Sequence, residues 1–137
     1  MKARRALLKS AVGLGTLGSM AAMAEAAAPG GRTPVKGGIR LGNLFFSSGL
    51  TAPGADVKEQ TEGILKAHKA NLEALGSSLE NVLKVTVFMA DIRKEKPAMN
   101  EVYARFFPKS APARSAIGVD FPDDATRLEI ELVAWIP

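Results

Sequence analysis

The chain has 137 residues, a formal net charge of +4, one histidine and no cysteine. This length allows one domain with a sizeable core, and the lack of cysteine excludes disulfides, thiolate metal sites and cysteine nucleophiles. His68 is the only histidine available for a zinc site or a Ser/His/Asp triad, so the commonest types of hydrolase active site are disfavoured.

The first 28 residues have the composition of an export signal. A basic head precedes residues 11–24, an uncharged Ala- and Gly-rich run that is too short for a membrane-spanning helix of roughly 20 residues and so predicts no stable membrane anchor. Within the head, the string ARRALLK at 3–9 resembles a twin-arginine motif, with an ordinary secretion signal as the alternative. We expect a cleavable signal over 1–28, a linker over 29–34, a folded domain over 35–137 and a periplasmic location.

The positive charge belongs mostly to that signal. Residues 1–28 hold four of the eighteen basic residues and one of the fourteen acidic residues, which leaves fourteen and thirteen in the remainder. A mature charge near +1, without a clustered basic stripe, argues against a nucleic-acid partner.

The first elements of the domain follow from turn signals and periodicity. The pair Gly42–Asn43 predicts a two-residue turn between strands at 39–41 and 44–48, followed by a loop at 51–55. A helix is predicted over 56–75, with Gly76 at its C-terminal end. One apolar stripe at 4-3-4-3 spacing marks its buried face, formed by Thr61, Leu65, His68, Leu72 and Leu75.

The second half of the chain predicts one more helix and three more strands. A short turn at 77–81 leads to a strand at 84–90, and a helix begins at Pro97 and ends near Phe107. Strands follow at 115–119 and 128–136. The order ββαβαββ predicts an α+β fold in which two helices cover one face of a mixed sheet.

The last predicted strand has two different faces. Leucine, isoleucine and alanine alternate on the core face, whereas Glu129, Glu131, Val133 and Trp135 share the face that the helices leave open. For an arbitrary strand this open face would be solvated. A tryptophan on it favours burial against a partner subunit.

Arg114 follows a proline corner and leads into a short apolar strand. A guanidinium can hold a carboxylate by two parallel hydrogen bonds at any working pH, whereas the simpler alternative is a surface salt bridge. His68, between Leu65 and Leu72, is interpreted as a core or helix-edge histidine. By spacing, the other apolar residues of the second helix are interpreted as core: Met99, Tyr103, Phe106 and Phe107.

Five segments together resemble the reactive intermediate deaminase family, also called RidA or YjgF. They occur in family order and cover roughly residues 35–136: LGNLFFSSG at 41–49, GSSLENVLKVTVF at 76–88, NEVYARFF at 100–107, PARS at 112–115 and LEIE at 128–131. The combination is specific, although each segment alone is weak.

The resemblance implies a chorismate-mutase-like fold that assembles as a homotrimer with clefts between subunits. It implies hydrolysis of reactive enamine or imine intermediates, of the 2-aminoacrylate and 2-iminobutanoate type, to 2-oxo acids and ammonia without metal or cofactor. In such a site Arg114 pairs with the substrate carboxylate and Glu129 activates water. Further substrate contacts would come from Ser48, Gly49, Asn100 and Ala116.

Two residues depart from the family pattern. Val35 stands where deaminating members tend to have tyrosine, and Ala116 stands where many have cysteine. Both changes make the expected pocket more apolar. A non-catalytic or divergent binder of a small carboxylate therefore remains the alternative function, and ribonuclease activity, sometimes attributed to this family, is the third.

Overall fold

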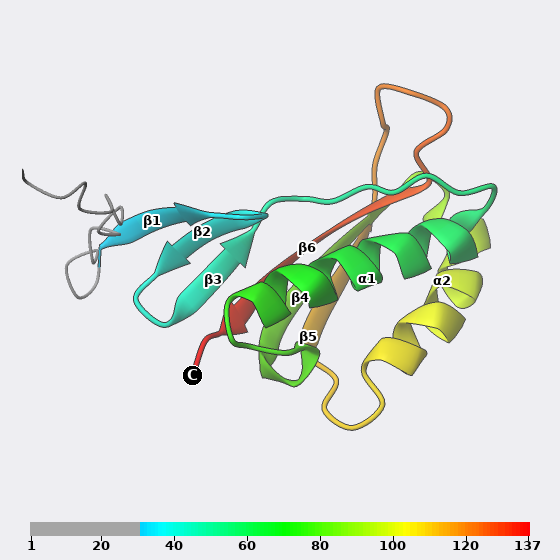
Figure 1. Cartoon of the computed structure of the whole chain (residues 1–137). Helices are drawn as coiled ribbons and strands as arrows, with labels where there is room; N and C mark the ends of the chain where they lie inside the picture. Colours follow the sequence, from blue (N-terminus) through cyan, green and yellow to red (C-terminus); the bar gives the residue numbers. More distant parts are fainter. Residues whose placement is uncertain (1–30) are drawn as a thin grey trace, which may run out of the picture.

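The computed structural model describes residues 31–137, so the expected export signal lies outside the described residues. Six strands form one sheet, and α1 and α2 lie on one of its faces, in front of the sheet in Figure 1. The predicted α+β architecture is confirmed. In chain order the elements are β1 (Arg32–Val35), β2 (Gly38–Leu41), β3 (Leu44–Ser47), α1 (Val57–Ala74), the 3₁₀ turn η1 (Leu79–Asn81), β4 (Val82–Met89), α2 (Ile92–Phe106), β5 (Ala113–Gly118) and β6 (Leu128–Trp135).

The strand order in the sheet is β1-β2-β3-β6-β4-β5. All neighbours are antiparallel except β4 and β5, which run parallel and are connected through α2. Parallel neighbours need such a crossover, whereas the two-residue turn at Gly42–Asn43 suffices for the antiparallel pair β2 and β3. This topology places β4 between the strands that carry Arg114 and Glu129.

The first strand is one difference from the sequence-based expectation. The composition of residues 32–34 predicts a linker, but they pair with β2 as part of strand β1. Proline lacks an amide donor and is therefore tolerated on an edge strand, which is where Pro34 lies in the described sheet. The order of elements is thus βββαβαββ.

The start of α2 is a second difference. The helix begins at Ile92, where the Asp91 side chain accepts a hydrogen bond from the Lys94 amide at 3.2 Å, so Pro97 lies inside the helix and not in its first turn. The proline removes one helical hydrogen bond, to the carbonyl of Arg93. Both residues are exposed, so water can solvate that carbonyl.

Helix α1 matches its prediction closely. Asp56 caps its N-terminus by accepting from the Glu59 amide at 2.9 Å. At the other end Gly76 has φ +73°, and its amide and that of Ser77 bond back to the carbonyls of Glu73 and Leu72. This left-handed position favours glycine, as the sequence indicated.

A single apolar core lies between the helices and the sheet. The strands contribute Phe45, Val85, Val87, Met89, Leu128, Ile130 and Leu132, and the helices contribute Ile64, Leu65, Leu72, Met99 and Tyr103. Burial of this kind stabilises the fold by roughly 1.5–3 kcal/mol per large side chain. Among residues 31–137, no helix has both the length and the apolar character to cross a membrane.

Candidate functional site

Arg114 lies on the helix-covered face of β5. In the parallel register Arg114 is level with Val85, whose side chain is fully buried in the core. Its guanidinium stacks on the Tyr103 ring of α2, with the guanidinium carbon 4.6 Å from the ring centroid. The structure thus places Arg114 between β5 and α2, at the edge of the sheet.

Arg114 has no ionic partner among residues 31–137. The ion pairs there join other residues, such as Arg127 to Glu95 and Lys58 to Glu101. The simple alternative of a surface salt bridge is therefore not what this part of the chain shows. Stacking occupies the face of the guanidinium and leaves the N–H groups at its edge available, which is the arrangement needed to hold a carboxylate.

Two buried oxygen atoms lie on α2, the helix whose Tyr103 contacts Arg114. The Oδ1 of Asn100 and the hydroxyl of Tyr103 are both buried without a hydrogen-bond partner in residues 31–137. Burial raises the pKa of Tyr103 to about 12, against the opposing effect of the Arg114 charge, so its hydroxyl stays protonated near neutral pH. Buried polar groups are usually paired, so both atoms have unused capacity for a hydrogen bond to a ligand, to water or to another chain.

Ala116 follows two residues later on the same face of β5. It is level with Val87 and packs against the core. Its methyl group offers no polar contact, so any hydrogen bond from this position would come from the backbone. We call Arg114, Tyr103, Asn100 and Ala116 the arginine cluster.

Glu129 lies on the opposite face of the sheet. It pairs with Phe88 on β4 and alternates with the buried Leu128 and Ile130. Its carboxylate lies against the backbone of Gly49: a Cβ on that residue would be 1.9 Å from Glu129 Oε1. Ser48, beside Gly49, is exposed. We call Glu129, Gly49 and Ser48 the glutamate cluster.

The register separates the two clusters within one protomer. Arg114 is level with Val85, and Glu129 with Phe88, three residues farther along β4. Three residues and two strand spacings each amount to roughly 10 Å, so the two backbones are on the order of 14 Å apart. Since the side chains also leave opposite faces, one small ligand cannot contact both in a single protomer.

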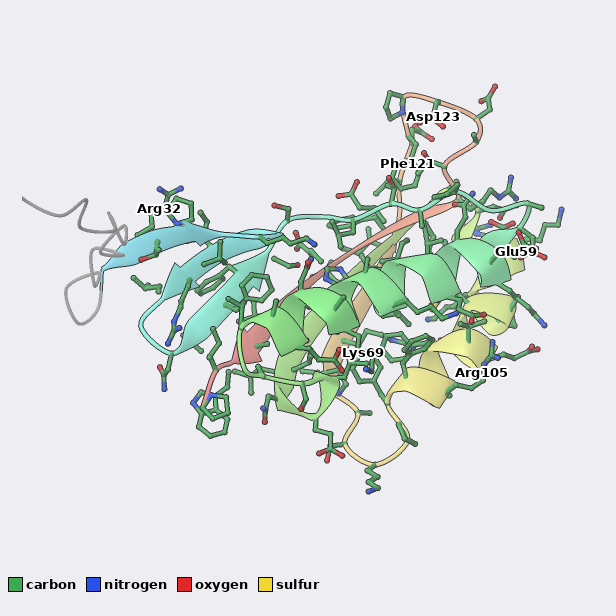
Figure 2. All side chains as sticks on the ribbon, viewed as in Figure 1. Arg32, Glu59, Lys69, Arg105, Phe121 and Asp123 are labelled. Carbon is green, nitrogen blue, oxygen red and sulfur yellow. The ribbon has the colours of Figure 1, made fainter. Side chains whose placement is uncertain are left out.

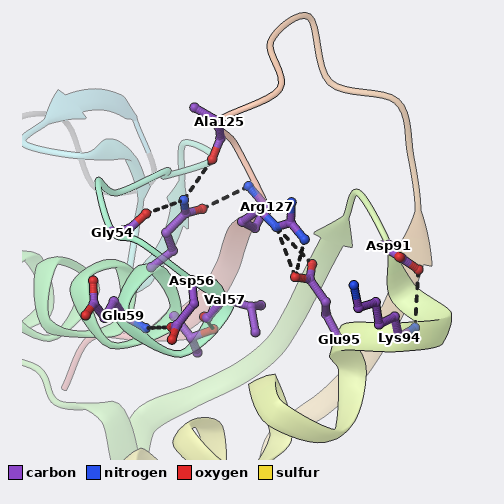
Figure 3. Close-up of polar contacts among 11 residues, drawn as sticks. Gly54, Asp56, Val57, Glu59, Asp91, Lys94, Glu95, Ala125 and Arg127 are labelled. Carbon is purple, nitrogen blue, oxygen red and sulfur yellow. Dashed lines mark hydrogen bonds and ion pairs between the residues drawn. The ribbon is translucent and has the colours of Figure 1, made fainter.

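A buried glutamine fixes the segments that lead to Glu129. The Gln60 amide donates to the carbonyls of Gly54 and Ala125, and its oxygen accepts from the Arg127 amide, at 2.8–3.1 Å. Arg127 in turn forms an ion pair with Glu95 on α2 (Figure 3). These contacts anchor the end of the loop that leads into β6, while residues near Phe121 and Asp123 project beyond the sheet (Figure 2).

The face opposite the helices is apolar and exposed. Four large hydrophobic side chains are each 42–46% exposed, and the strand registers place them on this face: Leu41, Phe46, Ile117 and Trp135. It also holds Lys84, which donates to the Ser115 hydroxyl at 2.7 Å, and a shallow hollow of about 110 Å³ between β3, β4 and β6. Several large exposed apolar side chains on one face of a sheet are typical of an interaction site.

His68 is a core residue, as its helical spacing indicated. It is fully buried, and its Nε2 lies 2.8 Å from the Ile130 carbonyl. Burial lowers its pKa below the usual value, although the backbone hydrogen bond opposes this effect. The described residues contain no group of three or more histidine, aspartate or glutamate side chains suited to a metal ion.

The sequence analysis does not identify Tyr103 as part of the arginine cluster, or Gln60 as the residue that anchors the loop before β6. Tyr103 was interpreted as a core residue, and only its i, i+3 spacing from Asn100 hinted that the two share a helix face. Gln60 gave no signal, because its partners lie up to 67 residues away in the chain.

Comparisons with known proteins agree on one family. Residues 25–136 match the family described as Endoribonuclease L-PSP. A RutC family protein of Pyrococcus horikoshii is 38% identical over 74% of this chain and 86% of its own. The chloroplastic Reactive Intermediate Deaminase A of Arabidopsis thaliana is 34% identical over 80% of this chain and 62% of its own.

Solved structures of the same family resemble this chain in fold and in sequence. A protein of Thermotoga maritima described as an endoribonuclease superposes with a TM-score of 0.68 at 35% identity, covering 75% of this chain and 87% of its own. A member of the YjgF/YER057c/UK114 family from Mycobacterium tuberculosis has a TM-score of 0.69 at 28% identity, covering 73% and 85%. With the matched fold and the five sequence segments, these likenesses establish that the chain belongs to the RidA/YjgF family, the one described as Endoribonuclease L-PSP.

Proposed function

We propose that this protein hydrolyses reactive enamine and imine intermediates of the 2-aminoacrylate and 2-iminobutanoate type to 2-oxo acids and ammonia. The observation that carries the proposal is the Arg114 guanidinium, which has no ionic partner in residues 31–137 and is stacked with its N–H edge free. Relatives named as reactive intermediate deaminases add support at about 34% identity.

In this proposal the complete site forms between copies of the chain. The arginine cluster of one copy faces the glutamate cluster of the next, since one protomer cannot bring them together. Contacts of this head-to-tail type close into a ring when the rotation is 120°, which gives a homotrimer with three equivalent sites. The apolar face that contains Phe46, Ile117 and Trp135 would then be covered by the neighbouring copies.

The proposed chemistry needs orientation and proton transfer more than a strong nucleophile. Arg114 holds the substrate carboxylate, and Glu129 of the neighbouring copy orients a water molecule and accepts its proton as the oxygen bonds to the imine carbon. That proton passes to the nitrogen and gives a carbinolamine. Glu129 then moves the hydroxyl proton to the same nitrogen as the C–N bond breaks, the C=O bond forms and ammonia leaves. One water is consumed, and no electrons are exchanged, so neither metal nor cofactor is part of this scheme.

A non-catalytic binder of a small carboxylate is the second candidate. Ala116 packs its methyl group against the core at the arginine cluster, and Val35 on β1 is likewise apolar. Such a pocket would retain the carboxylate clamp while offering fewer polar groups to guide a reaction. Ribonuclease activity is suggested by the family description and by a structural relative, but the sequence has no basic stripe to support it.

One experiment separates these candidates. Threonine dehydratase would generate 2-iminobutanoate in the presence of the purified protein, while semicarbazide competes for the imine and 2-oxobutanoate release is followed. We expect acceleration by the wild type, loss in Arg114→Ala and Glu129→Gln, and no change in Arg93→Ala, an exposed arginine of α2. If Arg114→Ala accelerates 2-oxobutanoate release as much as the wild type does, the deaminase proposal is refuted. If the wild type binds 2-oxobutanoate but does not accelerate its release, the non-catalytic binder is favoured.

We also propose export to the periplasm by the twin-arginine route. This rests on residues 1–28, which lie outside the described residues. Replacing Arg4 and Arg5 with lysine should leave precursor in the cytoplasm. Unchanged export of that variant would refute the twin-arginine assignment.

A further inference from the structure

The least explained feature of the arginine cluster is its tyrosine. Tyr103 is only 6% exposed, its hydroxyl has no hydrogen-bond partner in residues 31–137, and its ring packs on both Arg114 and Phe107. A leucine would fill much of the same core volume without leaving a polar atom unpaired. Besides filling core volume, the ring supplies the flat surface over which the Arg114 guanidinium lies.

We propose that Tyr103 is a positioning residue whose ring face fixes the Arg114 guanidinium with its N–H edge turned to the ligand carboxylate. This inference rests on the proposed carboxylate site and names the residue that orients it. Arg114 is on an edge strand and has neither a carboxylate nor a carbonyl partner within residues 31–137, so its long side chain would otherwise sample many rotamers. An aromatic face restricts a guanidinium while leaving all its donors free.

A carboxylate partner could not replace the ring. Arg127 shows the alternative: Glu95 accepts from both its Nε and its Nη2, which occupies the edge that a ligand would need. Stacking on Tyr103 therefore holds Arg114 without neutralising it. Phe107, with its ring centroid 4.7 Å from that of Tyr103, supports the tyrosine ring from within the core.

The test uses two substitutions of the same residue. Tyr103→Phe keeps the stacking ring and removes only the unpaired hydroxyl, whereas Tyr103→Leu removes the ring. With 2-oxobutanoate as the probe, calorimetry should give a Kd for Tyr103→Phe within about twofold of the wild type. We expect Tyr103→Leu to weaken binding roughly tenfold, because the entropy cost of ordering the Arg114 side chain would then reduce the binding free energy. Phe106→Leu, an aromatic loss on the same helix, is the matched control and should leave the Kd unchanged.

A spectroscopic readout separates positioning from a general loss of structure. Tyr103 is the only tyrosine in the chain, so protein labelled with ¹³C at the tyrosine Cζ gives a single resonance from this ring. Addition of 2-oxobutanoate should shift that resonance in the wild type and leave it in place in Arg114→Gln. In imine turnover, Tyr103→Leu should raise KM roughly tenfold and change kcat by less than about threefold.

The outcomes decide between this inference and the proposed function. Three results would each overturn the positioning role. They are unchanged binding of 2-oxobutanoate by Tyr103→Leu, equal weakening of binding by both Tyr103 variants, and no binding of 2-oxobutanoate by the wild type. If the wild type binds 2-oxobutanoate with the expected pattern but does not accelerate imine hydrolysis, the positioning role stands and the deaminase proposal fails.

Discussion

Gly49→Ala is expected to displace the Glu129 carboxylate with little effect on stability. A Cβ at this position would be 1.9 Å from Glu129 Oε1 and 2.6 Å from Cδ, whereas real Cβ contacts essentially never fall below 3.0 Å. The carboxylate must therefore retreat by about 1 Å. Gly49 does not have positive φ, so alanine adopts its backbone conformation without strain.

The expected stability change is the difference of two small effects. Gly→Ala at a compatible backbone position stabilises by about 0.4–1 kcal/mol through the unfolded state. An off-rotamer Glu129 side chain costs about 0.5–1.5 kcal/mol. The free energy of unfolding should thus change by no more than about 1 kcal/mol, which corresponds to a Tm shift of at most roughly 4–8 °C for a domain of this size.

The expected effect on turnover is much larger. A misplacement of about 1 Å in a catalytic group can reduce the rate about 100-fold. The assay is 2-oxobutanoate release from imine generated in situ, with urea unfolding measured in parallel. In the Glu129→Gln background Gly49→Ala should add little further loss, because the group it displaces no longer accepts a proton. Wild-type turnover in Gly49→Ala, or a full additional loss in the Glu129→Gln background, would refute the assigned role of Glu129.

Three further predictions concern the scaffold of the site. Burial lowers the pKa of His68 below its value of about 6.5 in the unfolded chain. The free energy of unfolding should therefore be highest above pH 6.5 and should fall as the pH drops toward the lowered pKa. Urea unfolding at pH 5 and 8 checks this, and His68→Gln should remove the pH dependence. Gln60→Leu removes three hydrogen bonds, to Gly54, Ala125 and Arg127. At roughly 0.5–1.5 kcal/mol net for each bond, it should cost about 1.5–4.5 kcal/mol by denaturant unfolding; a cost below about 0.5 kcal/mol would contradict its anchoring role. Trp135→Glu places a charge on the exposed apolar face and should shift the sedimentation coefficient from oligomer to monomer; an unchanged coefficient would show that this face is not the subunit interface.

Helix α1 illustrates how far local pattern suffices. Its apolar spacing and Gly76 predicted its extent to within one residue at each end, and the structure adds the Asp56 cap. Helix α2 shows the limit: the Pro97 signal competed with the Asp91 cap, and the cap determined the start. The strand at Arg32–Val35 was missed because residues 29–34, with two prolines and two glycines, have the composition of a linker, while the strand is stabilised by pairing with β2.

The chemical groups of the candidate site were visible in the sequence, but their arrangement was not. Arg114 and Glu129 were recognised from their local segments and from alternation along a strand. Alternation gives the two faces of one strand but cannot relate the faces of different strands. That relation depends on the insertion of β4 between β5 and β6 and on its register with each.

The sequence by itself determined the fold class, the apolar faces of the helices and β6, and the residue types able to clamp a carboxylate and handle a proton, because these follow from periodicity and side-chain chemistry. Only the tertiary structure decided that Arg114 stacks on Tyr103, that Gly49 packs on Glu129, and that the two clusters lie on opposite faces of the sheet. Contacts of that kind join residues 11 to 80 positions apart, and their geometry is set by packing and strand register, which no local pattern encodes.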